Sequence, residues 1–212
     1  MKRRRFLVIF IYLLLLISGP TTVLLNTPLS TVFRNQTTLI VTLQRLLGTV
    51  AYVMLFGQIV LGSKMGEWIK SLGGKAYRYH ITHGLIAYVV ILLHPLMQTV
   101  LDFKLRGPFA AAISLLPGSD IFLNFGKIAL LLITAAVFVG YFRTKPFLRR
   151  NWRKFHILTY IAFIFVGIHS WNLGTDVKDF PFVLTFIFGG VVGNLIIFQK
   201  IYFYFSKKLM VN

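Results

Sequence analysis

The stretch YHITHGLIAYVVILLHPLMQTVL, residues 79–101, decides the fold of this chain. Its 23 residues carry no formal charge, and as a helix they are long enough to cross the hydrocarbon core of a bilayer. The stretch also contains His80, His83 and His94. Because titratable side chains are costly inside a membrane helix, these histidines predict a functional site.

His80 and His94 share one face of this predicted helix. They are 14 residues apart, which on an α-helix leaves them within roughly 40° of each other and about 21 Å apart along the axis. A second apolar stretch, 155–175, contains His156 and His169, and no histidine lies in a predicted loop. Neutral imidazoles at two depths on two spans are the arrangement needed to hold two haem irons, one above the other.

Helix arithmetic leaves two questions open at these sites. His156 and His169 are 13 residues apart, which places them about 140° apart on a straight helix. Either this span is locally over- or underwound, with Gly167 as a place for the distortion, or the two haems are held at different angles. His83 lies 11 residues from His94 on nearly the same face, so it is an alternative to His80 as the inner ligand.

Composition places the chain among membrane proteins, since 57% of its residues are apolar and only 13% are charged. The absence of cysteine excludes disulfides, thiolate metal sites, iron–sulfur clusters and covalently attached haem. The few carboxylates lie outside the strongest apolar runs, which argues against paired-carboxylate hydrolysis. The 212 residues contain no glycine-rich dinucleotide fingerprint and no Walker loop, so another component is expected to deliver electrons.

The pattern predicts an all-α polytopic membrane protein, a bundle of six transmembrane helices forming one domain over residues 1–212. The expected spans are about 6–26, 39–62, 79–101, 125–143, 155–175 and 181–204. The basic start of the first span is also typical of a signal peptide, but Pro20 and the lack of an A-x-A-like site favour a retained helix. The net charge of +18 gathers at alternate span ends. This distribution predicts that both termini lie on the cytoplasmic side of a cell (inner or plasma) membrane, and it argues against nucleic-acid binding. Spans three and five then run in the same direction, so His80 should match His156 in depth and His94 should match His169.

The sequence resembles the ferric reductase-like transmembrane domain family, which includes ferric reductases, NADPH oxidases and the haem-binding membrane subunit of bacterial methionine sulfoxide reductase systems. The resemblance covers about residues 44–199. It rests on H-x13-H at His80/His94 with Gly84 four residues after the first histidine, and on H-x12-H at His156/His169. The segment QRLLGTVAYVMLFGQIVLGSK (44–64) and the basic W-x-x-F-H run at 152–156 are also similar to the family.

The resemblance implies that His80, His94, His156 and His169 bind two b-type haems, which carry electrons from the cytoplasmic to the outer side. The register of Gly84 favours His80 over His83. Fused members of the family carry a C-terminal flavin and nicotinamide domain, whereas this chain stops at Asn212. A separate flavin reductase or flavoprotein is therefore the expected donor, with FMN or FAD as a candidate cofactor at the cytoplasmic face.

Two electron acceptors follow from this resemblance. Ferric chelates would be attracted by Arg45, Lys104 and Arg106 on the outer side. The stand-alone architecture is nearest to the methionine sulfoxide reductase subunits, which predicts a periplasmic reductase as the alternative partner. In those subunits the inner position of the third span is often not histidine, so the full four-histidine set favours a ferric reductase-like oxidoreductase.

Several basic and aromatic residues have two interpretations. Arg45 is either a snorkelling anchor or a partner of a haem propionate. The Arg149–Lys154 cluster is a positive-inside determinant, and Arg149 and Arg153 are also candidates to bind propionates, a flavin phosphate or an acidic donor. For Phe163 and Trp171, ordinary packing is favoured over a role in electron transfer. The alternative of another class is a transporter or structural membrane protein in which the histidines serve packing or proton transfer.

Overall fold

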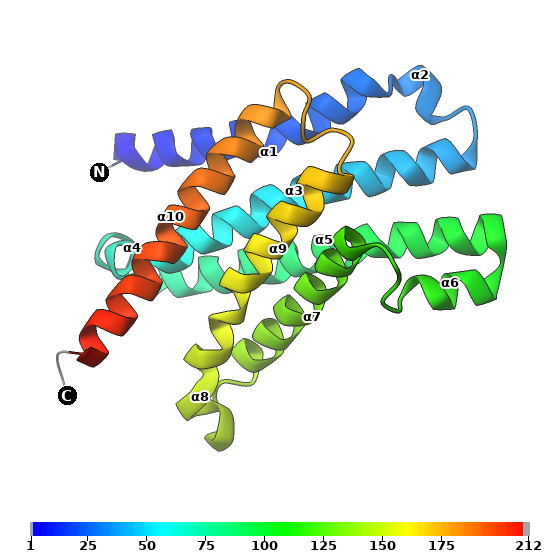
Figure 1. Ribbon diagram of the computed structural model, residues 1–212. Coiled ribbons are helices and arrows are strands. Elements are labelled where there is room, and N and C mark those ends of the chain that lie inside the picture. Colours follow the sequence, from blue (N-terminus) through cyan, green and yellow to red (C-terminus); the bar gives the residue numbers. More distant parts are fainter. Residues whose placement is uncertain (1, 210–212) are drawn as a thin grey trace.

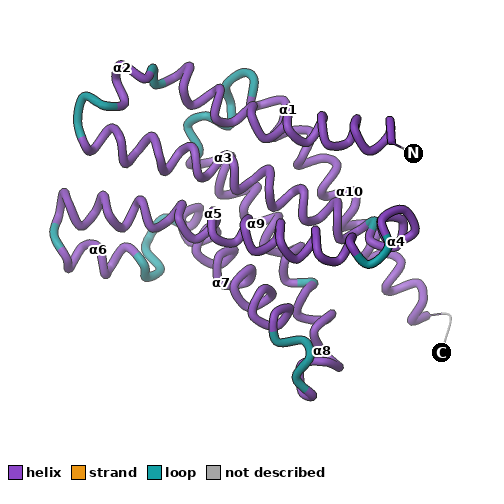
Figure 2. Tube along the Cα trace, turned by 180° about the vertical axis from the view of Figure 1, so that it is seen from behind, coloured by secondary structure: helices purple, strands orange, loops and turns teal. Residues whose placement is uncertain are grey.

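The computed structural model describes the backbone of residues 2–209 and the side chains of this range except those of residues 2–5, 153, 204, 205 and 207–209. Within the described range the chain forms helices joined by short connections, and it contains no strand (Figures 1 and 2). The helices are α1 (Lys2–Asn26), α2 (Leu29–Val32), α3 (Gln36–Ser63), α4 (Met65–Leu72), α5 (Lys75–Arg106), α6 (Pro108–Ser114), α7 (Ile121–Tyr141), α8 (Pro146–His156), α9 (Leu158–Leu173) and α10 (Phe182–Leu209).

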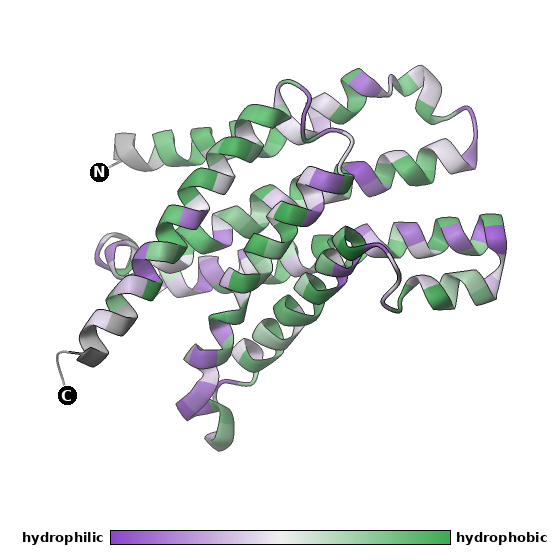
Figure 3. Ribbon diagram, viewed as in Figure 1, coloured by the Kyte–Doolittle hydropathy of each residue, from purple (hydrophilic) through white to green (hydrophobic). Residues whose placement is uncertain are grey.

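Six helical segments are long and apolar enough to cross a membrane, which confirms the predicted six-helix class. They are Phe6–Asn26, Gln36–Ser63, Lys75–Arg106, Ile121–Tyr141, Lys154–Leu173 and Phe182–Phe203. Apolar residues cover much of their length (Figure 3), and many of these side chains point outward: Leu131 and Phe198 are each 69% exposed. Such an outer surface suits lipid rather than water.

The segments predicted as loops contain four short helices, which corrects the sequence interpretation. Connection 26–38 contains α2, 63–78 contains α4, 102–124 contains α6, and the basic connection before the fifth span is α8. Local sequence explains two of the starts, since Pro108 and Pro146 occupy first-turn positions of α6 and α8, where the missing N–H costs nothing.

The transmembrane helices pack as neighbouring antiparallel pairs. α3 lies beside α5, and α7 lies beside α9 (Figures 1 and 2). α1 and α10 pack against α3 and against each other. Figure 1 places both chain ends, α4 and α8 toward one end of the bundle, and α2 and α6 toward the other.

An aromatic core joins α3, α9 and α10. The ring of Tyr52 stacks on Phe163 and Phe186, with ring centroids 5.8 and 4.6 Å apart. The Tyr52 hydroxyl donates a hydrogen bond to the carbonyl of Phe186 at 2.8 Å, so the polar end of this ring is satisfied inside the core. Gly193 of α10 lets that helix approach Phe163, because a Cβ at this glycine would lie 2.5 Å from Phe163 Cε1.

Replacing Gly193 with alanine therefore forces a methyl group against a ring that is 1% exposed. We expect G193A to destabilise the fold by about 1–3 kcal/mol through overpacking. The matched control is G167A on α9, where a Cβ would meet nothing within 4 Å. It should be neutral or stabilising by up to about 1 kcal/mol, through helix propensity. Thermal unfolding in detergent measures both, and equal losses in the two variants would contradict this account.

Candidate functional site

Four histidines meet in two pairs at two levels of the bundle. His80 of α5 lies against His156, the last residue of α8, with ring centroids 6.0 Å apart. His94 of α5 lies against His169 of α9, with ring centroids 6.5 Å apart. The predicted matching of His80 with His156 and of His94 with His169 is therefore present in the structure. We call His80/His156 the inner pair and His94/His169 the outer pair.

A helix break allows both histidines of the fifth span to face α5. α8 ends at His156, Ile157 is not part of either helix, and α9 begins at Leu158. The carbonyl of His156 accepts a hydrogen bond from the Thr159 hydroxyl at 2.7 Å, while the Tyr160 amide bonds the carbonyl of Ile157 at 2.9 Å. This three-residue bond is the tight 3₁₀ type, so the chain is locally overwound here. The distortion lies at Ile157 and not at Gly167, where α9 is continuous.

The outer pair is anchored through its rings. The Nδ1 of His94 lies 2.9 Å from the carbonyl oxygen of Gln44, and the Nδ1 of His169 lies 2.9 Å from that of Phe122. A carbonyl oxygen can only accept, so each Nδ1 carries the proton. Each Nε2 is then left with its lone pair, which is the form in which imidazole binds a metal.

The inner pair is anchored mainly through its backbone. Gln58 Nε2 donates to the carbonyl of His80 at 3.1 Å, and Thr159 caps the carbonyl of His156. The Nδ1 atoms of His80 and His156 are both buried and have no hydrogen-bond partner among the described residues. Trp152 contacts the His156 ring edge-to-face, with centroids 6.0 Å apart.

His83 occupies a different position, between α5, α1 and α3. Gln58 Nε2 donates to His83 Nδ1, and the donor assignment is supported because the same amide nitrogen also bonds the carbonyl of His80. His83 Nε2 therefore carries the proton and donates to the Tyr12 hydroxyl oxygen at 2.5 Å. Both ring nitrogens of His83 are thus engaged, which favours His80 as the inner member that faces His156.

Arg45 points to the other side of α3, toward the connection between α9 and α10. Its guanidinium forms an ion pair and hydrogen bonds with Asp176, and a further bond with Thr27 at 2.6 Å. Asn26 of α1 also donates to Asp176, at 3.0 Å. Arg45 thus links three segments at the end of the bundle that holds the outer pair, and its predicted contact with a propionate stays a prediction.

The other predicted site residues lie at the two ends of the bundle. Arg149 is exposed on α8, and the side chain of Arg153 lies outside the described residues. Lys104 and Arg106 are exposed at the far end of α5, where Lys104 Nζ donates to Gln36 Oε1 at 2.6 Å. Phe163 belongs to the aromatic core, in agreement with the packing interpretation.

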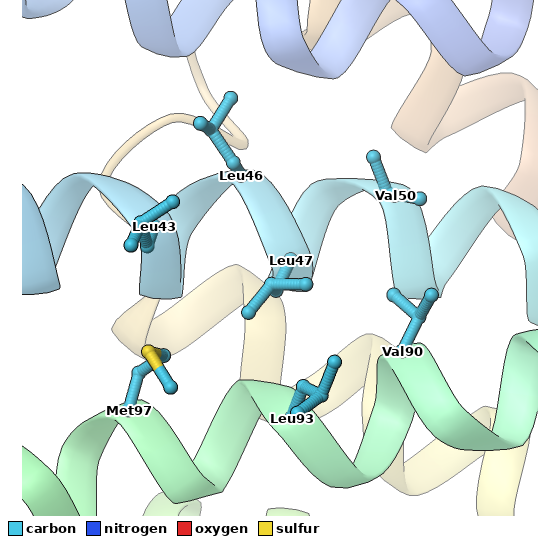
Figure 4. Close-up of a pocket in the computed structure, with 7 residues that line it drawn as sticks. All are labelled: Leu43, Leu46, Leu47, Val50, Val90, Leu93 and Met97. Atoms are coloured by element: carbon cyan, nitrogen blue, oxygen red, sulfur yellow. The ribbon is translucent and has the colours of Figure 1, made fainter.

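An apolar groove of about 370 Å³ lies between α3 and α5. Figure 4 shows Leu47 and Leu93 pointing toward each other between these helices. The groove is lined by Leu43, Leu46, Leu47, Val50, Val90, Leu93 and Met97. These side chains offer no hydrogen-bonding group that could orient a polar ligand, so the chemistry of the protein is to be sought at the histidine pairs.

Comparison with known families agrees with this geometry. The family described as ferric reductase like transmembrane component matches residues 47–167, which is more than half of the chain. The chain belongs to this family. The matched segment contains His80, His94 and His156 and ends two residues before His169. No curated protein and no solved structure matches the chain.

Family membership makes the chain a multi-pass membrane protein with an electron-transfer function of the cytochrome type. Members of the family typically bind haem, and the two histidine pairs fit that group. Metal–imidazole bonds are about 2 Å long, so two rings whose centroids lie about 6 Å apart are spaced for one metal ion between them. The described residues contain no group of three or more metal-ligating side chains.

Sequence reasoning missed the groups that hold the histidines in place. Gln44 and Phe122 act through backbone carbonyls, which a sequence does not reveal. Gly48 and Gly126 follow them by four residues and leave room for the rings of His94 and His169. A signal for these glycines was present: Gly48/Gly62 and Gly126/Gly140 repeat the 14-residue spacing of His80/His94.

The Arg45–Asp176 link predicts a pH-dependent stability. Burial by itself would raise the pKa of Asp176, but hydrogen bonds from Arg45 and Asn26 and the charge of Arg45 outweigh it and lower this pKa below its ordinary value. A carboxylate with a depressed folded pKa stabilises the fold above its unfolded pKa of about 3.9 and loses this contribution as pH falls further.

We therefore expect Asp176→Asn to lower the unfolding free energy at pH 7 by on the order of 3 kcal/mol, because Arg45 loses its partner. The difference from the unmodified protein should shrink as pH falls below about 4. Thermal unfolding at a series of pH values measures it. Asp179→Asn is the control, because the exposed Asp179 carboxylate accepts a hydrogen bond from Asn26 and, among the described residues, none from Arg45. A loss that does not change with pH would refute the assignment.

Proposed function

We propose that this protein is a b-type membrane cytochrome that binds two haems and passes electrons from a cytoplasmic flavin or flavoprotein to an acceptor on the outer side. The observation that carries the proposal is the meeting of two histidine pairs at two levels, with ring centroids 6.0 and 6.5 Å apart. His80 and His156 would hold the inner haem, and His94 and His169 the outer one. On this proposal residues 1–212 act as one haem domain.

The charge distribution supports an orientation with both termini in the cytoplasm. Both chain ends, α4 and α8 lie toward one end of the bundle (Figure 1). Lys64 and Lys70 flank or belong to α4, and Arg149, Arg150 and Lys154 are exposed on α8. Basic residues near span ends favour the cytoplasmic side. The inner pair then lies on the side of the donor.

A bound haem supplies one-electron redox chemistry at its iron. On this proposal the chain would supply two imidazoles at each level, and the backbone carbonyls of Gln44 and Phe122 would orient those of the outer pair. Since all four imidazoles are engaged as ligands on this proposal, no coordination position is left for an acceptor molecule. The acceptor therefore receives its electron at the periphery of the outer site.

Charged residues provide the encounter surfaces at both ends. The exposed basic residues of α8 would attract a flavin phosphate or an acidic donor, and α8 ends directly at His156. At the opposite end, Arg106 has a side chain that is 73% exposed and lies 3.8 Å from Asp102. Lys104 and Arg106 would attract a negatively charged ferric chelate.

The purified protein should show a low-spin b-type spectrum with two haems per chain. His94→Ala removes an outer ligand, so we expect one haem to be lost and electron transfer to the outer acceptor to fall at least about 100-fold. Reduced-minus-oxidised visible spectra, haem quantification and chelate reduction in vesicles measure these quantities. A colourless protein from haem-replete cells, or a variant with undiminished transfer, would refute the proposal.

His83 provides the matched control for His80. His83→Ala removes two hydrogen bonds between helices but no proposed ligand, so both haems should be retained with a loss of about 1–3 kcal/mol in stability. His80→Ala should instead lose the inner haem. If His83→Ala lost a haem and His80→Ala kept both, His83 would be the inner ligand.

A further inference from the structure

The two histidine pairs differ in how their rings are held. Both outer rings donate from Nδ1 to a backbone carbonyl, each at 2.9 Å. Both inner rings have a buried Nδ1 without a partner among the described residues. Each pair has one member on α5 and one on the fifth span. On both of these spans the outer histidine has a partner for its Nδ1 and the inner histidine has none among the described residues.

Each outer ring rests against a carbonyl and a glycine of the neighbouring helix, and we call these two contact sites together the outer cradle. On α3, the carbonyl of Gln44 is followed four residues later by Gly48, and on α7 the carbonyl of Phe122 is followed four residues later by Gly126. A Cβ at Gly48 would lie 2.9 Å from His94 Cε1, and one at Gly126 would lie 2.8 Å from His169 Cε1. Each imidazole therefore rests on bare backbone beside its carbonyl acceptor.

The corresponding inner positions are looser. A Cβ at Gly62 would lie 3.5 Å from His80 Cε1, an ordinary contact, and one at Gly140 would meet nothing within 4 Å. The side chains of Gln58 and Thr159 hold the inner histidines by their backbone carbonyls. These bonds hold the backbone of the inner pair and do not engage its ring nitrogens.

A further link stiffens the outer cradle on the α3–α5 side. Gln44 Nε2 donates to Gln98 Oε1 at 3.1 Å, and Gln98 Nε2 donates to the carboxylate of Asp102 at 3.1 Å. Gln98 and Asp102 follow His94 at steps of four residues along α5. The helix that carries His94 is thus tied to the residue whose carbonyl orients its ring.

These contacts predict unequal sites. An Nδ1–H bond to a carbonyl fixes the tautomer and ring orientation and makes the imidazole a stronger donor, and losing such a partner typically costs about 10–100-fold in metal affinity. We propose that the outer pair is a preorganised, high-affinity haem site and that the inner pair is the site from which haem is more readily lost. This inference rests on the proposed two-haem function and adds to it which of the two sites holds its haem more tightly.

The first experiment compares single-site proteins. His80→Ala retains the outer pair and His94→Ala retains the inner pair, and haem transfer to apomyoglobin in excess reports the loss of the remaining haem. We expect loss from the outer pair to be at least about 10-fold slower. The outer haem should also show the lower midpoint potential, because a stronger imidazole donor favours the ferric state. Equal or reversed rates would overturn the inference.

The second experiment alters the cradle without removing a ligand. G48A and G126A should each speed haem loss from the outer pair in the His80→Ala background by about 10-fold and raise its midpoint potential. G62A and G140A, at the equivalent inner positions, should leave the outer haem unchanged. If all four variants changed the rate of haem loss from the outer pair equally, the outer cradle would not be the cause of tighter haem binding, and the inference would fail.

The outcomes separate this inference from the proposed function. Unmodified protein without haem overturns both. If the two haems are lost at equal rates, the inference that the outer pair binds haem more tightly is wrong, but the proposed cytochrome function is not affected. Should G48A or G126A fail to fold, the comparison of His80→Ala with His94→Ala still decides the question.

Discussion

The structure depends on the need of each buried imidazole for a defined partner. In a hydrocarbon environment an imidazole cannot rely on water, so its nitrogens must be satisfied by protein or by a ligand. Carbonyl acceptors meet this need for His94 and His169, and Tyr12 and Gln58 meet it for His83. The Nδ1 atoms of His80 and His156 have no partner among the described residues. Helix approach, glycine placement and the break in the fifth span all follow from these arrangements.

The bundle can be described as two similar helix pairs facing each other. α3 and α5 form one pair, and α7 and α9 form the other. In each pair the first helix provides a carbonyl and a glycine, and the second provides the histidine that rests on them. α1 and α10 cover α3, and the aromatic core around Tyr52 fills the space between α3, α9 and α10. The outer level is therefore the more regular part of the bundle.

Hydropathy and histidine spacing predicted much of this arrangement. The six spans follow from apolar runs whose length matches a bilayer, and the pairing of His80 with His156 follows from spans three and five running in the same direction. The partner of His83 could not be predicted, because Tyr12 lies 71 residues away and the sequence does not indicate which spans pack together. A local distortion of the fifth span was one of the predicted alternatives, but its place at Ile157 was not, because it depends on a Thr159 hydroxyl that bonds the carbonyl of His156.

The break at Ile157 places the two histidines of the fifth span on two different helices, α8 and α9. His169 lies on α9, which packs into the aromatic core through Phe163. His156 is the last residue of α8, a helix with exposed basic side chains. The backbone around Ile157 and the bond from the Thr159 hydroxyl join α8 to α9, and α7 packs against both helices. Because α8 ends on an imidazole, a partner that binds its basic surface would act first on the ring of His156, and so on the inner pair.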